Sequence, residues 1–238
     1  MTAARASIGM LVFDGMTHLD FGAPFDVFSR MPDTTVHVLS PRGRDVVTDL
    51  GQTVPAPFAM ADAPPLDVLF VGGGPGVNAL MEDDAVLAWL VERAPQASWI
   101  TSVCTGALVL GAAGLLQGYR AATHWAARDI LRTFGAEPST ERVCIDRDRA
   151  TGGGVTAGLD FALVLAARWH GEDRARGMQL GMEYDPAPPF PGGTPESSPP
   201  AVVDRVRGAM APMTAARAAI AERVRARPGW PGRADRSA

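Results

Sequence analysis

The 238-residue sequence contains no lysine, so all 22 basic residues are arginines. Without lysine, the chain cannot form a Schiff base through a lysine amine or build a lysine-containing phosphate loop. Only two cysteines are present, too few for a disulfide framework, and we expect both to be reduced thiols. The longest apolar run, 107–116, is about half a membrane span. These absences predict a cytoplasmic protein that does not enter membranes.

Basic charge and metal-ligand patterns are also scarce. The net charge is −4 and no basic run occurs, which argues against a nucleic-acid partner. Histidine, cysteine and acidic residues do not cluster at ligand spacing, so we expect no metal site. Apolar residues make up 47 % of the chain and charged residues 20 %, which is enough apolar material for a sizeable folded core.

Short apolar segments alternate with segments of helical period along most of the chain. This alternation predicts an α/β fold, a flavodoxin-like doubly wound and mainly parallel sheet with helices on both faces. A polar stretch, 41–53, resembles a hairpin. The expected strands are 7–13, 35–39, 67–71, 98–103 and 142–146, and the expected helices are 20–30, 83–92, 105–115, 125–134 and 156–169.

The composition changes towards the C-terminus. The stretch 184–200 is rich in proline and should be irregular, because proline is excluded from helix interiors and central strands. A helical period follows over 202–227, and the residues from Pro228 onward are expected to fray. We therefore predict one α/β domain over 1–200, with 201–238 as a peripheral helix and tail rather than a second domain.

One cysteine lies at the sharpest junction of the chain. Cys104 follows the strand 98–103 and precedes a helix, in the sequence VCTG, where Gly106 permits a tight turn. A helix N-terminus favours a thiolate and predicts a lowered thiol pKa. A cysteine buried only for packing fits the same pattern. Cys144, inside a strand, is expected to be structural.

Three further features lie near predicted strand ends. Glycines 72–74 and 76 follow a buried strand and could direct backbone amides at a negative charge, or simply form a tight connection. They match neither a dinucleotide fingerprint nor a phosphate loop. Asp20 could act in a site or cap the following helix. His124 could pair with a thiolate or be structural.

The segments VGGGPGV, TSVCTGALVLGAAGLL, ATHWA and TGGGVTAGLDFAL, in this order, resemble the DJ/PfpI branch of the class I glutamine amidotransferase-like superfamily. The resemblance runs from Ser7 to about Phe190. HLDFGAP, CTG and EYDPAPPF are most similar to its isocyanide-hydrating subgroup. The resemblance implies a homodimeric lyase without cofactor. It would hydrate small uncharged isocyanides (isonitriles) to N-substituted formamides through a covalent thioimidate.

The resemblance also implies roles for individual residues. Cys104 matches the nucleophile of the elbow, and Asp20 matches the acid that hydrogen-bonds it and moves a proton. Thr105 matches the residue that offers a backbone amide and a hydroxyl to the site. Gly74 matches the glycine whose amide faces the sulfur. His124 lies in a shared segment near the site and receives no role.

Other members of the superfamily supply the alternatives. The protease-like branch has histidine where this chain has Thr105, and no downstream His–Glu pair for glutamine hydrolysis is present. A glyoxalase- or deglycase-like enzyme stays possible, although such enzymes usually pair the cysteine with glutamate rather than aspartate. Related regulators carry a helix-turn-helix domain, for which the roughly 38 residues after Pro200 are too few. A free-standing thiol sensor is the remaining alternative.

Overall fold

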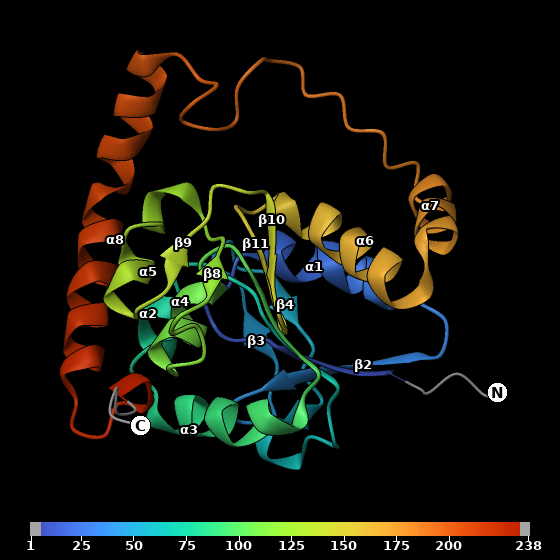
Figure 1. Ribbon diagram of the computed structural model, residues 1–238, viewed down its shortest axis with the longest axis horizontal. Coiled ribbons are helices and arrows are strands. Elements are labelled where there is room, and N and C mark those ends of the chain that lie inside the picture. The colour runs from blue at the N-terminus through green and yellow to red at the C-terminus, as the bar shows by residue number, and fades with distance from the viewer. Residues whose placement is uncertain (1–5, 234–238) are drawn as a thin grey trace.

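The computed structural model describes residues 6–233, which are built around one central sheet (Figure 1). Within the described residues, seven strands lie in the order β10-β11-β7-β6-β1-β2-β5, and every neighbouring pair is parallel except β10 and β11. Two short pairs, β3–β4 and β8–β9, lie apart from it. The strands are β1 (Ala6–Leu11), β2 (Thr34–Ser40), β3 (Val46–Val47), β4 (Thr53–Val54), β5 (Phe58–Ala59), β6 (Val68–Val71), β7 (Trp99–Val103), β8 (Arg120–Ala121), β9 (Glu137–Pro138), β10 (Val143–Asp146) and β11 (Arg149–Gly152).

Helices cover both faces of the sheet. On one face α1 packs against α6, and on the other α4 packs on β6 and β7 and is surrounded by α2, α3, α5 and α8. The helices are α1 (His18–Phe28), α2 (Val77–Leu80), α3 (Asp84–Arg93), α4 (Gly106–Ala112), α5 (Ile130–Thr133), α6 (Ala157–His170), α7 (Glu172–Gly181) and α8 (Pro200–Ala226), with single 3-10 turns η1 (Met60–Asp62), η2 (Ala94–Gln96), η3 (Trp125–Ala127) and η4 (Pro231–Arg233). The predicted doubly wound α/β class is confirmed.

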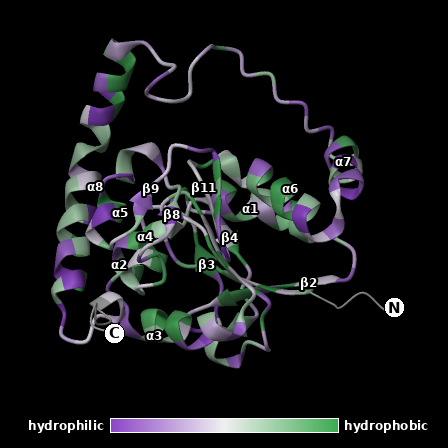
Figure 2. Cartoon of the chain, in the orientation of Figure 1, coloured by the Kyte–Doolittle hydropathy of each residue, from purple (hydrophilic) through white to green (hydrophobic). Residues whose placement is uncertain are grey.

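The core lies where apolar strands meet apolar helix faces. Figure 2 shows hydrophobic residues gathered in the central strands and α4, while α7 and much of α8 are hydrophilic. All four residues of β6 are buried, as expected for a strand covered on both faces. Phe28 of α1, Phe70 of β6 and Phe161 of α6 meet with ring centroids 6.0 to 6.2 Å apart. This aromatic cluster joins the α1–α6 layer to the sheet.

Several elements differ from the sequence-based expectation. The helix expected over 105–115 ends at Ala112, because Gly114 adopts a φ of +74° and breaks it. The helix expected over 125–134 is two short pieces, η3 and α5. Strand β11 and helix α7 were not predicted. The hairpin expected within 41–53 corresponds to the antiparallel pair β3–β4.

The C-terminal segment corrects another expectation. The irregular segment predicted over 184–200 is found over 183–199, since Pro200 begins α8, and it passes as an extended arc from α7 to α8 (Figure 1). The tail from Pro228 does not fray within the described residues, because Trp230 is only 7 % exposed. Its indole lies against Phe134, and its Nε1 donates to the carbonyl of Ala112, 2.8 Å away, at the end of α4. The rest of that tail, 234–238, lies outside the described residues, and the domain division at residue 200 stays a prediction.

Candidate active site

Cys104 stands on a strained turn between β7 and α4. Its φ is +55°, a left-handed conformation that residues other than glycine rarely adopt. The turn is held on both sides, since the Cys104 N–H donates to the Gly153 carbonyl at 2.7 Å and its carbonyl accepts from Thr123 Oγ1 at 2.8 Å. Gly106 is required next to it, because a Cβ there would lie 2.1 Å from the carbonyl oxygen of Val71. A strained backbone conformation that several hydrogen bonds hold in place is typical of a functional position.

Asp20 approaches this turn from α1. It is not the N-cap of its helix, which begins two residues earlier with Thr17 at the cap. The Asp20 side chain is 0 % exposed, and its Oδ2 accepts a hydrogen bond of 2.9 Å from the Gly73 N–H. The other oxygen, Oδ1, has no well-formed hydrogen bond among the described residues, and the Cys104 thiol lies close enough to interact with the carboxyl. Burial raises the pKa of Asp20 to about 7, although the contacts with Cys104 and Gly73 lower it.

The electrostatics of Cys104 correct the expected thiolate. Cys104 is 4 % exposed, and burial raises the pKa of its thiol well above the ordinary value. The charge of Asp20 raises that pKa further, while hydrogen bonds from the backbone and side chain of Thr105 lower it. The prediction of a lowered pKa is therefore wrong, because α4 has only seven residues and burial outweighs its dipole. The pair at rest consists of a neutral thiol beside a carboxyl that titrates near neutrality.

Thr105 and the glycines of the β6 turn complete the surroundings of the sulfur. The Gly74 N–H donates to Thr105 Oγ1 at 3.1 Å, so the structure places this amide one link away from the sulfur. The role assigned to Gly74 stays a prediction. Gly73 lets the turn after β6 approach the pair closely, because a Cβ there would lie 2.5 Å from Thr105 N and 2.7 Å from Asp20 Oδ2. A side chain at Gly73 would collide with both groups.

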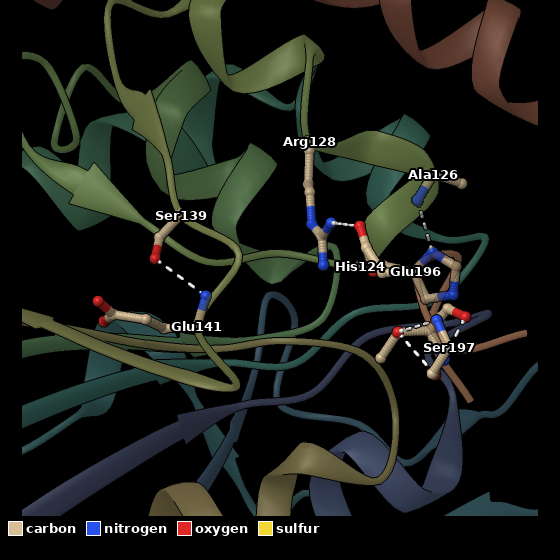
Figure 3. A network of polar contacts seen from close by, with 8 residues as sticks. His124, Ala126, Arg128, Ser139, Glu141, Glu196 and Ser197 are labelled. Atoms are coloured by element: carbon tan, nitrogen blue, oxygen red, sulfur yellow. Dashed lines mark hydrogen bonds and ion pairs between the residues drawn. The ribbon is translucent and has the colours of Figure 1, made fainter. Parts of the chain in front are cut away.

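His124 lies beside the turn without joining the pair. It follows Thr123 and lines a cavity of about 260 Å³ with Arg128 and Gly153. Its Nδ1 accepts from the Ala126 N–H at 3.3 Å (Figure 3), and Thr194 and Pro195 line the same cavity. Burial lowers the pKa of His124, and nearby arginines add to that effect. These contacts favour a neutral, structural imidazole.

One residue of the site has no counterpart in the sequence-based prediction. Arg217, in the C-terminal half of α8, is only 7 % exposed. Its Nη2 donates to the Gly74 carbonyl at 2.9 Å, across a sequence separation of 143 residues, and its Nε donates to Asn78 Oδ1 at 3.2 Å. No sequence signal distinguishes it from the other arginines of α8.

A doubly wound sheet with a strained cysteine between strand and helix, beside a buried acid, defines the class of α/β proteins that carry a nucleophile elbow. Within that class, residues 6–168 match the model of the DJ-1/PfpI family. The chain belongs to this family, as the resemblance of its motifs predicted.

Relatives extend the likeness over almost the whole chain. An isonitrile hydratase of Pseudomonas putida is 48 % identical over 220 residues, which cover 92 % of this chain and 96 % of that protein. The crystal structure of a ThiJ/PfpI family protein from Pseudomonas syringae superposes with a TM-score of 0.89 at 40 % identity, covering 92 % of this chain and 91 % of the other. The helix-turn-helix transcriptional regulator GbdR of Pseudomonas aeruginosa is 32 % identical over 175 residues, or 70 % of this chain, but the match covers only 47 % of the regulator.

No helix among residues 6–233 combines the length and the apolar character that a membrane span needs.

Proposed function

We propose that this protein hydrates isocyanides to N-substituted formamides, with Cys104 as nucleophile and Asp20 as the group that moves protons. The observation that carries the proposal is the buried pair itself, a thiol on a strained turn beside a carboxyl whose pKa is raised to about 7. A base that titrates near neutral pH can both accept and return a proton during one catalytic cycle. The similarity to an isonitrile hydratase over 92 % of the chain supports the substrate class.

In the first half of the reaction, the Cys104 sulfur attacks the terminal carbon of the isocyanide. The Asp20 carboxylate takes the thiol proton as the C–S bond forms, and returns it to the same carbon. The product is a thioimidate, R–N=CH–S–Cys104, which contains all the atoms of substrate and thiol. The donors of Thr105 face the sulfur and offset the negative charge that develops there before bond formation.

In the second half, water adds to the imidate carbon. Asp20 accepts a proton from this water as the water oxygen bonds to carbon, and delivers the same proton to the imidate nitrogen, which restores the carboxylate. The resulting intermediate, R–NH–CH(OH)–S–Cys104, collapses as the C–S bond breaks. Its hydroxyl proton passes through Asp20 to the sulfur, which releases R–NH–CHO and restores the thiol. The net reaction consumes one water, and covalent catalysis divides one difficult addition into two easier ones.

The proposal is tested with purified protein and cyclohexyl isocyanide, with formamide quantified by liquid chromatography. Cys104→Ala should form no formamide above the uncatalysed background. Cys144→Ala is the matched control, because Cys144 is a fully buried cysteine of β10 outside the site, and it should retain turnover. Formamide production by Cys104→Ala at the parental rate would remove Cys104 from the mechanism.

The alternative activities give different outcomes in the same preparation. A glyoxalase-like enzyme would consume methylglyoxal and form no formamide from the isocyanide. A thiol sensor would react with peroxide and turn over neither compound, but the low exposure of Cys104 disfavours this function. The homodimer that the family resemblance implies stays a prediction, which sedimentation velocity would test.

A further inference from the structure

Helix α8 runs along the side of the molecule, next to α2 and α5 (Figure 1), and most of its residues face solvent. Its buried residues among those described are Arg217, Ile220, Ala221 and Val224. Three of these are apolar and explain how the helix packs. The fourth is a charge removed from water, which destabilises the fold unless its surroundings compensate for it.

Arg217 differs from the other arginines of α8 in its partners. Arg207 and Arg223 each form an ion pair with an acidic side chain, and both lie closer to solvent. Arg217 forms no ion pair with a carboxylate among the described residues. Its hydrogen bonds go to two neutral oxygens, the Gly74 carbonyl and Asn78 Oδ1. Its positive charge is therefore not neutralised by any acid in contact with it.

The bond to Gly74 connects Arg217 to the sulfur of Cys104. The Gly74 carbonyl accepts from Arg217, and the N–H of the same residue donates to Thr105 Oγ1. Thr105 in turn offers its N–H and its hydroxyl to the Cys104 sulfur. A continuous chain of hydrogen bonds thus runs from the guanidinium of α8 to the nucleophile.

The charged and titratable groups around Cys104 come from separate elements. Asp20 of α1 lies against the thiol, and Asp49 acts on Asp20 with a negative charge. His124, beside the turn, has a pKa lowered by burial and by Arg217 and Arg128. Burial also lowers the pKa of Arg217, whereas a negative charge on Cys104 raises it. Arg217 is therefore a cation that favours a negatively charged Cys104.

We propose that Arg217 is a positioning residue of the active site, which makes α8 part of the site rather than a peripheral addition. Its bond to Gly74 fixes the turn that orients Thr105, and its unpaired positive charge stabilises negative charge on the sulfur. The inference rests on the proposed function only in taking Cys104 as the reacting group.

The experiment measures the reactivity of Cys104 without any isocyanide. In the Cys144→Ala background Cys104 is the only thiol, and its alkylation by iodoacetamide is followed by intact mass between pH 6 and 10. Below the thiol pKa, a rise of one unit in that pKa slows alkylation about tenfold. Arg217→Met should slow it by about that factor at pH 7.5 and shift the whole profile to higher pH. Arg217→Lys, which keeps the charge, should recover most of the rate.

Arg223→Met is the matched control, because it removes an ion pair between α8 and Glu82 on the exposed side of the helix. Its alkylation profile should equal that of the parent. An unchanged profile in folded Arg217→Met overturns the proposal. If Arg217→Met does not fold, Arg217→Gln and Arg217→Lys decide instead, and equal rates for these two overturn it. Absence of formamide from the parent would refute the proposed function without affecting this measurement, so the two failures are distinguishable.

Discussion

The Asp20→Asn variant should be more stable than the parent at pH 8, and this difference in stability should disappear as the pH is lowered. The unfolded carboxyl titrates near 3.8, and the buried one at about 7. Below pH 3.8 Asp20 is protonated in both the native and the unfolded protein, so its titration takes nothing from the free energy of unfolding. Between the two values the unfolded chain releases a proton that the native state retains, and stability falls by about 1.4 kcal/mol per pH unit. Above pH 7 no further loss occurs.

The magnitude follows from the interval that can be measured. Between pH 5 and pH 7 the free energy of unfolding of the parent falls by about 1.4 kcal/mol for each pH unit, or about 3 kcal/mol in all. Asp20→Asn is neutral throughout and keeps an oxygen that can accept from Gly73, so it avoids this loss. The difference in unfolding free energy between variant and parent should therefore grow by about 3 kcal/mol between pH 5 and pH 8. In a chain of this size that difference corresponds to roughly 6–12 °C in Tm.

Urea unfolding followed by tryptophan fluorescence at pH 5, 6, 7 and 8 measures this difference directly. Asp14→Asn is a control of opposite sign, because the Val47 N–H and Arg44 hold the pKa of Asp14 below its usual range. The contribution of Asp14 to the free energy of unfolding is present above about pH 4 and is lost only as the pH falls further. A difference between Asp20→Asn and parent that is the same at pH 5 and pH 8 would refute the argument that burial of Asp20 sets its pKa.

Two further substitutions test the packing at the two ends of α4. Gly73→Ala should reduce isocyanide turnover by at least about tenfold, because its Cβ would lie 2.5 Å from Thr105 N and 2.7 Å from Asp20 Oδ2 and must displace the groups beside the sulfur; parental turnover would contradict this. Trp230→Phe should lower the free energy of unfolding by about 1 kcal/mol in urea titration, because it keeps an aromatic ring but leaves the Ala112 carbonyl without its donor, and an unchanged unfolding midpoint would show that this bond contributes nothing.

The sequence predicted those parts of the molecule that local pattern determines. The apolar runs that became β1, β6 and β7 are bounded by turn residues, and their alternation with helices predicts a parallel sheet. Because the carboxyl ends of parallel strands lie at one edge, Cys104 and Asp20 could be placed near each other from sequence alone.

Other features depend on tertiary packing that no local pattern encodes. The segment around Trp230 looks like a loose tail, and only the carbonyl at the end of α4 and the ring of Phe134 give it a fixed place. Arg217 resembles its neighbours in sequence, and only the docking of α8 distinguishes it. The direction of the Cys104 pKa shift depends on how completely the thiol is buried and on the charge of Asp20, neither of which is visible in the sequence.

The two ends of α4 depend on residues that are synthesised well after the helix itself. Arg217 bonds the turn beside the start of this helix, and Trp230 bonds its final carbonyl. Translation adds roughly 5–20 residues per second, so a nascent chain exposes Cys104 for several seconds before Arg217, roughly 110 residues later, has been synthesised. During that interval neither of these two hydrogen bonds can form. Assembly of the reactive centre therefore waits for the synthesis of α8, and a chain that ends before α8 would carry Cys104 without the hydrogen bond from Arg217 to Gly74.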